Sequence, residues 1–397
     1  MIGEKKMQEF EFYLPTKIYF GEGVIKKAGQ EARRFGQRAL VVTGKSSAKK
    51  TGALQKVEIS LKEAGVEMVL FEGVEPNPSL KTAESGAELA KEKRCQVVIG
   101  LGGGSPMDAA KAVAVLSTNP APADQYLGRN RVKEPPLPII EIPTTAGTGS
   151  EVTPYAVLTE IKKEGSRKKI LTDHLIFPKV ALVDPELTLS LPGSITADTG
   201  VDALSHAIEG YIANNSQPIS DLLALKAIKL LVHHLPKVMD NPEDIKARSY
   251  VLYASLLAGM VIAQTGTILV HGMGYRITSD FGLPHGRANG LLLPWVCEFN
   301  LTERYDKFAL LAESLGEEVK NLSKEEAAKK AIRGIQRLLR ELGMPENLKD
   351  RKIKEETIRE FAEEIMQDER KLANNPRRAT LEDIIKIYKR ALRGEIS

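Results

Sequence analysis

The chain has 397 residues, of which 42% are hydrophobic and 5% aromatic, and its 56 basic and 52 acidic side chains leave a formal net charge of +4. The near balance of charge and the scarcity of stacking rings argue against a nucleic-acid partner, and the hydrophobic content excludes disorder as the main state. The two cysteines, Cys95 and Cys297, are too few for a disulfide framework and favour a reducing, cytoplasmic compartment.

Short aliphatic runs alternate with helical patterns between residues 10 and 190, which predicts an α/β domain built on a parallel, doubly wound sheet. The predicted strands are 39–43, 67–71, 97–101, 137–142 and 180–183, and the predicted helices between them are 51–65, 81–93 and 106–116. We expect the short segment 18–20 to act as an edge strand that pairs two subunits, which predicts a homodimer.

Long helical patterns replace the strand signals after Leu191-Pro192-Gly193. They cover 197–212, 221–238, 324–342, 355–366 and 381–392. We therefore divide the chain into an α/β domain, 1–192, and an all-helical domain, 193–397.

One uncharged segment, 251–270, is long enough to cross a bilayer. Gln264, Thr265 and Gly266 interrupt its apolar character, so we interpret it as a helix at the centre of the helical domain. The charged N-terminus lacks the apolar run of a signal peptide. We expect a protein without a membrane anchor.

The sharpest local signal, 97–111, joins a strand, a run of three glycines and a helix start. Glycines let a phosphate approach the free backbone amides at a helix N-terminus. Ser105 suits the N-cap, Pro106 the first helical position, and Asp108 the third position, from which its side chain returns to the cap. The pattern favours a diphosphate-binding loop over an unliganded tight turn.

A second polar loop, 143–151, follows another predicted strand and combines threonines with glycines. It is a candidate second wall of the same phosphate or ribose site. Alone, this loop is weak evidence, because threonine and glycine are common in loops.

Four residues of the helical domain form a candidate metal site. Asp202 and His206 are spaced i, i+4 and so share one helix face, while His271 and His285 flank a turn. One carboxylate and three imidazoles would give a site of charge +1 with a divalent ion and leave positions open for a substrate oxygen. The alternative for each histidine taken singly is a hydrogen-bonded core residue.

The ordered motifs resemble the iron-containing, group III alcohol dehydrogenase family over nearly the whole chain. They are the glycine loop, the loop 144–151, Gly200 to Gly210 with its Asp and His, His271-Gly272-Met273, and Pro284-His285-Gly286. The resemblance implies that 1–192 is a dinucleotide-binding domain and that 193–397 is a helical domain that binds the metal and the substrate. It further implies hydride transfer between a nicotinamide cofactor and a small primary alcohol or aldehyde in the cleft between these domains. It also implies Fe(II), although zinc or another divalent metal suits the same ligands.

The resemblance also assigns residues. The metal ligands and catalytic residues are Asp202, His206, His271 and His285. The cofactor contacts are Gly102, Gly103, Gly104, Ser105, Asp108, Thr144, Thr145, Thr148, Thr153, Val157, Lys169 and Leu187, and the alignment at Lys169 leaves room for a slip of one residue. The substrate pocket is expected along Ile262 and Thr267. Because the segment 256–268 has no basic residue, we expect short uncharged aldehydes there.

The sequence departs from the family pattern at three places. Tyr275 stands where many members have a second histidine, so either the tyrosine or water takes over a proton relay. Lys371 stands where some members have a small residue near the nicotinamide, and its role is open. The third departure is at the end of the second strand, where NAD-dependent members often have an aspartate.

At that place the chain has Gly44, Lys45, Ser46 and Ser47. An aspartate would bind the ribose hydroxyls and repel a 2′-phosphate. Its loss, together with the gain of hydroxyl, amide and ammonium donors, predicts a preference for NADP(H), with NAD(H) still usable.

Two further functions stay open at this point. A dehydroquinate synthase-like lyase would share the architecture, the NAD and the metal, but it needs basic residues for an anionic phosphosugar. A glycerol dehydrogenase-type polyol oxidoreductase is the nearest neighbour within the preferred class. Net turnover of the reduced cofactor separates an oxidoreductase from a lyase.

Overall fold

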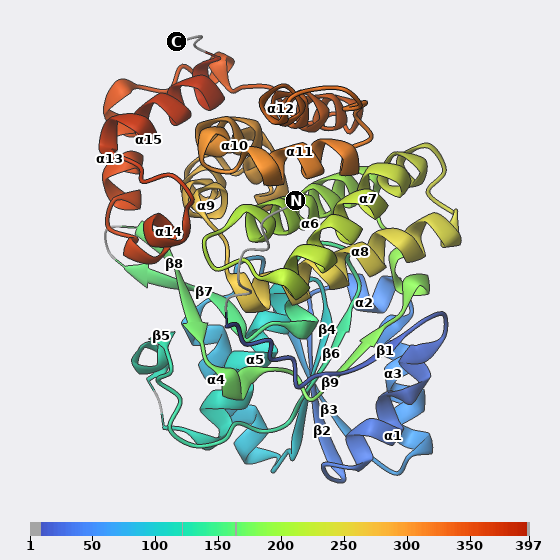
Figure 1. The fold of residues 1–397 in the computed structure, drawn as a ribbon. Coiled ribbons are helices and arrows are strands. Elements are labelled where there is room, and N and C mark those ends of the chain that lie inside the picture. Colours follow the sequence, from blue (N-terminus) through green and yellow to red (C-terminus); the bar gives the residue numbers. More distant parts are fainter. Residues whose placement is uncertain (1–8, 121, 163–164, 395–397) are drawn as a thin grey trace.

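The computed structural model describes residues 9–120, 122–162 and 165–394. A six-stranded parallel sheet forms the centre of the N-terminal half, in the order β1-β9-β6-β4-β2-β3 (Figure 1). Its strands are β1 (Lys17–Phe20), β2 (Arg38–Gly44), β3 (Glu67–Val74), β4 (Val97–Gly102), β6 (Ile139–Pro143) and β9 (Val180–Val183). The predicted parallel, doubly wound sheet is confirmed.

Helices cover both faces of this sheet because successive strand residues point to opposite sides. They are α1 (Ala28–Arg33), α2 (Ser47–Lys50), α3 (Ala53–Glu63), α4 (Leu80–Glu92) and α5 (Gly104–Thr118). Val41 and Ile99 pack in a core with α1 and α3, whereas Leu40 and Val98 pack in a core with α4 and α5. Aliphatic side chains on both faces explain why the central strands are continuous hydrophobic runs.

A second, smaller sheet was missed by the sequence analysis. It contains β5 (Gly128–Arg129), β7 (Tyr155–Lys162) and β8 (Gly165–Thr172), of which β7 and β8 form an antiparallel pair. The many charges of this segment indicate a solvated loop, but Ala156, Leu158 and Leu171 supply the alternating buried side. The hairpin projects beside the helical half (Figure 1).

The chain after residue 193 is helical throughout its described part, as expected. The helices are α6 (Gly193–Ile212), α7 (Pro218–Asp240), α8 (Ile245–Thr265), α9 (Leu269–Phe281), α10 (His285–Asn300), α11 (Tyr305–Ser314), α12 (Lys324–Glu341), α13 (Glu355–Ile365), α14 (Glu369–Asn374) and α15 (Leu381–Tyr388). By length and composition, α8 is the one described helix that would suit a membrane span. It is mostly buried among its neighbours, which is the expected place of a central core helix.

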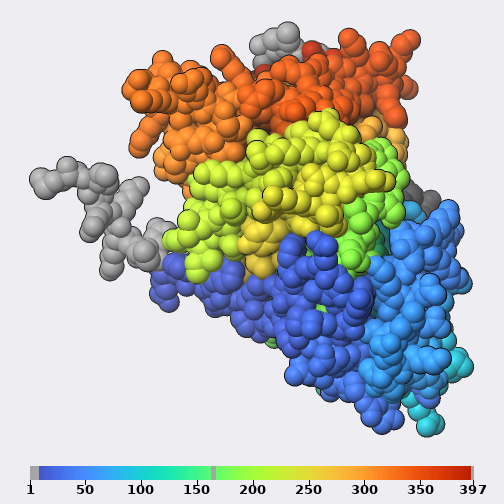
Figure 2. All heavy atoms as spheres, turned by 90° about the vertical axis from the view of Figure 1, so that its right-hand side faces the viewer, coloured from blue at the N-terminus to red at the C-terminus, as the bar shows by residue number. Residues whose placement is uncertain are grey.

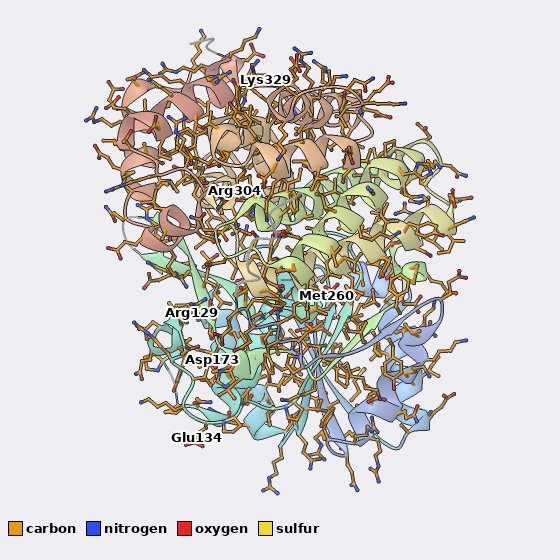
Figure 3. The ribbon with its side chains drawn as sticks, viewed as in Figure 1. Arg129, Glu134, Asp173, Met260, Arg304 and Lys329 are labelled. Carbon is orange, nitrogen blue, oxygen red and sulfur yellow. The ribbon has the colours of Figure 1, made fainter. Side chains whose placement is uncertain are left out.

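The two halves lie against each other, with the blue N-terminal half below and the yellow-to-red half above (Figure 2). Ala146, Val152, Ala181 and Val183 of the first half belong to the same hydrophobic core as the helices of the second. Met260 of α8, labelled in Figure 3, lies at the level where the halves meet and packs on this core. Residue 192 therefore marks a change from α/β to helical structure, and the two parts share one hydrophobic core. That they form two separate domains remains a prediction.

Candidate metal and dinucleotide site

Three of the four predicted metal ligands converge. The ligand atoms of Asp202 on α6, His271 on α9 and His285 at the start of α10 all lie within 4.8 Å of one another. Gly286 makes this approach possible, because a Cβ there would lie 1.7 Å from the carbonyl oxygen of Asp198. The first turn of α10 therefore packs directly on the backbone of α6.

The fourth predicted ligand, His206, lies beside this cluster. Its ring stacks on that of His271, with 4.4 Å between the centroids, and its Nδ1 is 3.3 Å from the carbonyl oxygen of Gly147. A hydrogen bond from Nδ1 to a carbonyl leaves Nε2 with a free lone pair. His206 is thus held in the tautomer that binds a metal through Nε2.

Glu209 and Asn289 support the cluster and were missed by the sequence analysis. Fully buried Glu209 accepts hydrogen bonds from the backbone amides of Ile268 and His271, and its other oxygen makes a short contact with Nδ1 of His271. Glu209 follows His206 by three residues and Asn289 follows His285 by four, so helical spacing carried a signal for both.

The side-chain amide of Asn289 shows where the acceptor atoms point. Its nitrogen lies 2.9 Å from Oδ1 of Asp202, 3.0 Å from Nε2 of His271 and 3.3 Å from Nε2 of His285. Lone pairs from three residues therefore meet at one place. A carboxylate and imidazoles in this arrangement are a donor set that fits a divalent transition metal.

The electrostatics of the cluster also favour a cation. Burial lowers the pKa of His206 to about 4 and lowers that of His285, so both rings are neutral at pH 7 and keep lone pairs for a metal. Burial also opposes a charge on His271, but Glu209 and Asp202 raise the pKa of its ring to about 9. Burial opposes ionisation of Asp202 as well, yet the surrounding histidines hold its pKa below the usual range.

Helix α5 begins two residues earlier than expected, at Gly104 instead of Pro106. Gly103 is the N-cap, and Ser105 lies inside the first turn, where its Oγ accepts from the amide of Asn77 at 3.1 Å. The predicted capping role of Ser105 is therefore wrong, and so is the predicted return of the Asp108 side chain to the cap. Asp108 instead accepts from Oγ of Ser150 at 2.8 Å and from another backbone amide, that of Val157.

The second loop packs directly on the first. A Cβ on Gly104 would lie 2.8 Å from the Thr148 side chain, so glycine is required for this contact. Buried Lys111 of α5 fixes the far end of the loop, where its Nζ donates to the carbonyl oxygens of Ser150, Thr153 and Tyr155 at 2.6, 3.0 and 2.8 Å. Only the fold brings Lys111 to these carbonyls, which explains why the sequence did not indicate this role.

A cavity of about 520 Å³ joins the glycine loop to the metal cluster. Of the predicted residues, it is lined by Gly104, Ser105, Asp108, Thr148, Thr153, Val157, Ile262, Thr267, Asp202, His206, His271, His285, Tyr275 and Lys371. Within the described chain, the structure does not bring Gly102, Gly103, Thr144, Thr145, Lys169 or Leu187 to its wall. Leu187 is buried in the core of the α1 face.

The lysine on β8 that faces the cavity is Lys168. Adjacent strand residues face opposite sides, so Lys169 points outward and is exposed. If the family alignment is shifted by one residue, the cofactor contact expected of Lys169 falls on Lys168, which does line the cavity.

The turn Gly44–Ser47 lies outside the cavity wall, next to the glycine loop. The position of a Cβ on Gly44 is 3.8 Å from the ring of Pro106 in α5. Lys45, Ser46 and Ser47 are exposed.

The comparisons with known proteins agree with this site. Residues 15–185 match the family described as iron-containing alcohol dehydrogenase, and residues 196–392 match the C-terminal part of the Fe-containing alcohol dehydrogenase family. The chain belongs to the iron-containing alcohol dehydrogenase family. It is an NAD(P)-dependent oxidoreductase, which decides against the dehydroquinate synthase-like lyase.

Similar iron-containing alcohol dehydrogenases cover almost the full length of the chain. NAD-dependent methanol dehydrogenase of Bacillus methanolicus is 36% identical over 381 residues, which are 96% of this chain and 99% of that enzyme. NADPH-dependent butanol dehydrogenase of Clostridium saccharobutylicum is 35% identical over 390 residues, 95% of this chain and 96% of that enzyme. The crystal structure of a 1,3-propanediol oxidoreductase has a TM-score of 0.93 at 36% identity and covers 97% of this chain and 100% of that one.

Proposed function

We propose that this iron-containing alcohol dehydrogenase transfers a hydride between NADP(H) and a small primary alcohol or aldehyde. In this proposal Asp202, His206, His271 and His285 hold Fe(II), and the parts of the two loops that line the cavity, Gly104, Ser105 and Thr148, hold the cofactor. The observation that carries it is the single cavity that contains both the metal cluster and the N-terminus of α5. Reacting groups placed in one enclosed space are positioned for a direct transfer.

The protein's own residues supply binding, orientation and exclusion of water. Amides at the start of α5 bind the diphosphate, and Glu209 fixes the ring of His271. A bound divalent metal supplies Lewis-acid polarisation of the substrate oxygen. Tyr275 stacks on His285 with 5.4 Å between ring centroids, and burial raises the pKa of its phenol far above the usual value. Tyr275 therefore keeps its proton at neutral pH, and its ring packs on that of His285.

Cofactor oxidation tests this function. Protein reconstituted with Fe(II) or Zn(II) and mixed with NADPH and butanal should lose the absorbance of the reduced nicotinamide at a metal-dependent rate. His271→Ala should lower kcat/KM by about 1,000-fold, because a Lewis acid contributes several kcal/mol to the barrier. Exposed His174 supplies the matched control His174→Ala, which should keep full activity. Full activity in metal-free protein would refute the metal's role.

The preference for NADP(H) rests on the turn at the end of β2. Gly44 has no carboxylate to repel a 2′-phosphate, and the exposed side chains of Lys45, Ser46 and Ser47 offer donors to it. Lys49 is less free to contribute, because it forms an ion pair with Glu72 on β3.

The Gly44→Asp variant tests this preference. A Cβ at this position lies 3.7 Å from the nearest atom, so the variant is expected to fold without displacing its neighbours. It should lower the ratio of kcat/KM for NADPH over NADH by about tenfold or more, mainly through KM for NADPH. Gly44→Ala adds the Cβ without charge and should leave the ratio near that of the wild type. A wild type that already prefers NADH would contradict the proposal.

We also propose a cytoplasmic homodimer. Strand β1 forms one edge of the sheet, and Phe20 on it stacks edge-to-face on Tyr253, both with more than a third of their surface exposed. An open edge with exposed aromatic rings is suited to pairing with a second copy. Light scattering should give twice the mass of the chain, and Phe20→Lys should shift the protein toward monomer.

A further inference from the structure

Cationic side chains reach the substrate end of the cavity. The segment 256–268 indeed contains no basic residue, but Arg370 and Lys371 of α14 line the same cavity. Both residues lie about a hundred positions later in the sequence. Arg129 on β5, labelled in Figure 3, also lines the cavity and is exposed, as is Arg370, so both belong to its rim. The expectation of an uncharged pocket therefore needs revision.

Lys371 lies beside the metal cluster. Its ammonium contacts Oγ1 of Thr267, and its Cγ lies 3.5 Å from where a Cβ on Gly272 would stand. Gly272 directly follows His271 of the cluster, and Thr267 lies in the short connection between α8 and α9 that leads to this histidine. A small molecule in this cavity can therefore meet Lys371 and the cluster together.

The ammonium of Lys371 has no carboxylate within ion-pairing distance among the described residues. Burial lowers the pKa of this group, which reflects the cost of removing an ammonium from water. Glu209 and Asp368 offset part of this cost through space, but the hydrogen-bond partner of the ammonium is a hydroxyl and not a carboxylate. An incoming anion would supply the missing charge.

The carboxylates around Lys371 are occupied elsewhere. Asp368 caps α14 by accepting from the backbone amide of Lys371 at 3.1 Å. Glu209 is bound to His271, and Asp108 is bound to Ser150. Asp202 belongs to the metal cluster. The negative groups of this cavity therefore already have partners.

Lys168 has a different position. Its Nζ lies 5.3 Å from the centre of the Tyr275 ring. Burial lowers the pKa of its ammonium, whereas the carboxylates of Asp202 and Asp108 act to raise it. Lys168 therefore has the carboxylate of Asp202, from the metal cluster, as a counter-charge, whereas the hydrogen bond of Lys371 goes to a hydroxyl.

We propose that Lys371, with Arg370 at the rim, binds an anionic group at the far end of the substrate. This rests on the proposed function and narrows it to short aldehydes and alcohols that carry a carboxylate or similar anion at the end away from the reacting carbon. Lys371 thereby determines specificity by charge, while the metal cluster acts on the carbonyl end.

The test compares substrates of matched length with the reconstituted wild type. 4-Oxobutanoate, a three-carbon aldehyde sulfonate, butanal and methyl 4-oxobutanoate differ in charge but little in length. We expect kcat/KM for at least one anion to exceed that for both neutral aldehydes by tenfold or more, and this advantage should shrink as salt is added. The anion with the higher kcat/KM shows whether the site prefers a carboxylate or a sulfonate. Neutral aldehydes used as well as both anions would overturn the inference.

The Lys371→Met variant keeps the length of the side chain and removes its charge. It should lower the ratio of kcat/KM for 4-oxobutanoate over butanal by tenfold or more, and Lys371→Arg should restore part of it. Exposed Lys386 on α15 supplies the control Lys386→Met, which should keep the wild-type ratio. An unchanged ratio in Lys371→Met would refute the assignment.

Binding without turnover gives an independent readout. Butanoate should raise the melting temperature of the NADP-loaded wild type more than butanamide does, and Lys371→Met should lose this difference. Equal shifts in the wild type would count against an anion site. Absence of turnover with every aldehyde would instead defeat the proposed function, so the two failures are distinguishable.

Discussion

His271, one of the proposed metal ligands, depends on Glu209, which is not itself a proposed ligand. Glu209 binds both the backbone amide and Nδ1 of this histidine, which fixes the ring and directs Nε2 toward Asp202 and His285. Carboxylates in this position increase the basicity of a metal-bound imidazole. Glu209 is fully buried, so its charge acts with little screening by water.

Replacing Glu209 by Gln should weaken metal binding by about 10- to 100-fold, as is usual for loss of a ligand's hydrogen-bond partner. Competition with a chelator, read from the protein-bound metal, measures this directly. Glu303→Gln changes an exposed carboxylate of the same half and serves as the control. Unaltered metal affinity in a folded Glu209→Gln protein would show that Glu209 has only a structural role.

The residues that the sequence could predict are those whose signal is local. The i, i+4 spacing of Asp202 and His206 indicated a shared helix face, and Glu209 and Asn289 obey similar spacings, so extending the rule would have found them. Lys371 differs, because its partners lie more than a hundred residues earlier in the chain. No local pattern reveals such a contact.

At the scale of elements, the polar loop 143–151 packs against α8 through a close contact between two glycines, Gly149 and Gly259. A Cβ on Gly259 would lie 2.7 Å from the Cα of Gly149, and a Cβ on Gly149 would lie 2.4 Å from the Cα of Gly259. Gly149 also has a φ of +62°, which other residues rarely adopt. The crossing holds the loop between the two halves of the molecule.

The Gly259→Ala variant should push the loop away from α8, because the atoms met by the new methyl group are backbone. We expect KM for NADPH to rise severalfold and the free energy of unfolding to fall by about 1–3 kcal/mol, as for overpacked cores. Gly193→Ala, where the nearest atom is a methionine methyl group at 3.5 Å, is the matched control and should change neither value. An unaffected KM in Gly259→Ala would show that the loop tolerates displacement.

The elements themselves were predictable to different degrees. The central strands were predicted because they are aliphatic runs that end at glycine or proline. In the structure, β2 and β4 are such runs, and each ends at a glycine. The start of α5 was placed two residues late, because Gly104 has no Cβ to prevent the earlier turn and Asp108 has better partners across the fold. The β7–β8 hairpin was missed because its charged faces hide the buried alternation of Ala156 and Leu158.

For the molecule as a whole, Glu141 makes stability depend on pH. It is fully buried on β6, and neither carboxyl oxygen has a hydrogen-bond partner. The side chain fits only because Gly100 on β4 leaves room, since a Cβ there would lie 2.2 Å from Oε2. Burial raises the pKa of Glu141 well above its ordinary value of 4.5, so the folded protein holds the proton more tightly than the unfolded chain.

A raised pKa in an acid stabilises the fold fully below the unfolded value and loses that contribution as pH rises through the folded value. Glu141→Gln should therefore match the wild type near pH 4.5 and exceed its free energy of unfolding by about 1.4 kcal/mol or more at pH 9. Denaturant unfolding at both pH values measures the difference. Glu63→Gln, at an exposed position, should show none, and a pH-independent offset in Glu141→Gln would contradict the assignment.

The core shared by both halves has a kinetic consequence. Separating the two halves would expose Ala146, Val152 and Ala181, together with the helical side chains that pack on them, to water. Exposing apolar surface costs a free energy of ~25 cal/mol for each square ångström. Because this cost opposes a hinge motion, we expect the shared core to set the distance between a bound nicotinamide and the metal cluster. Cofactor and product would then exchange through the mouth of the cavity, and we expect the side chains of Arg129 and Arg370, which line it, to affect the rate of exchange.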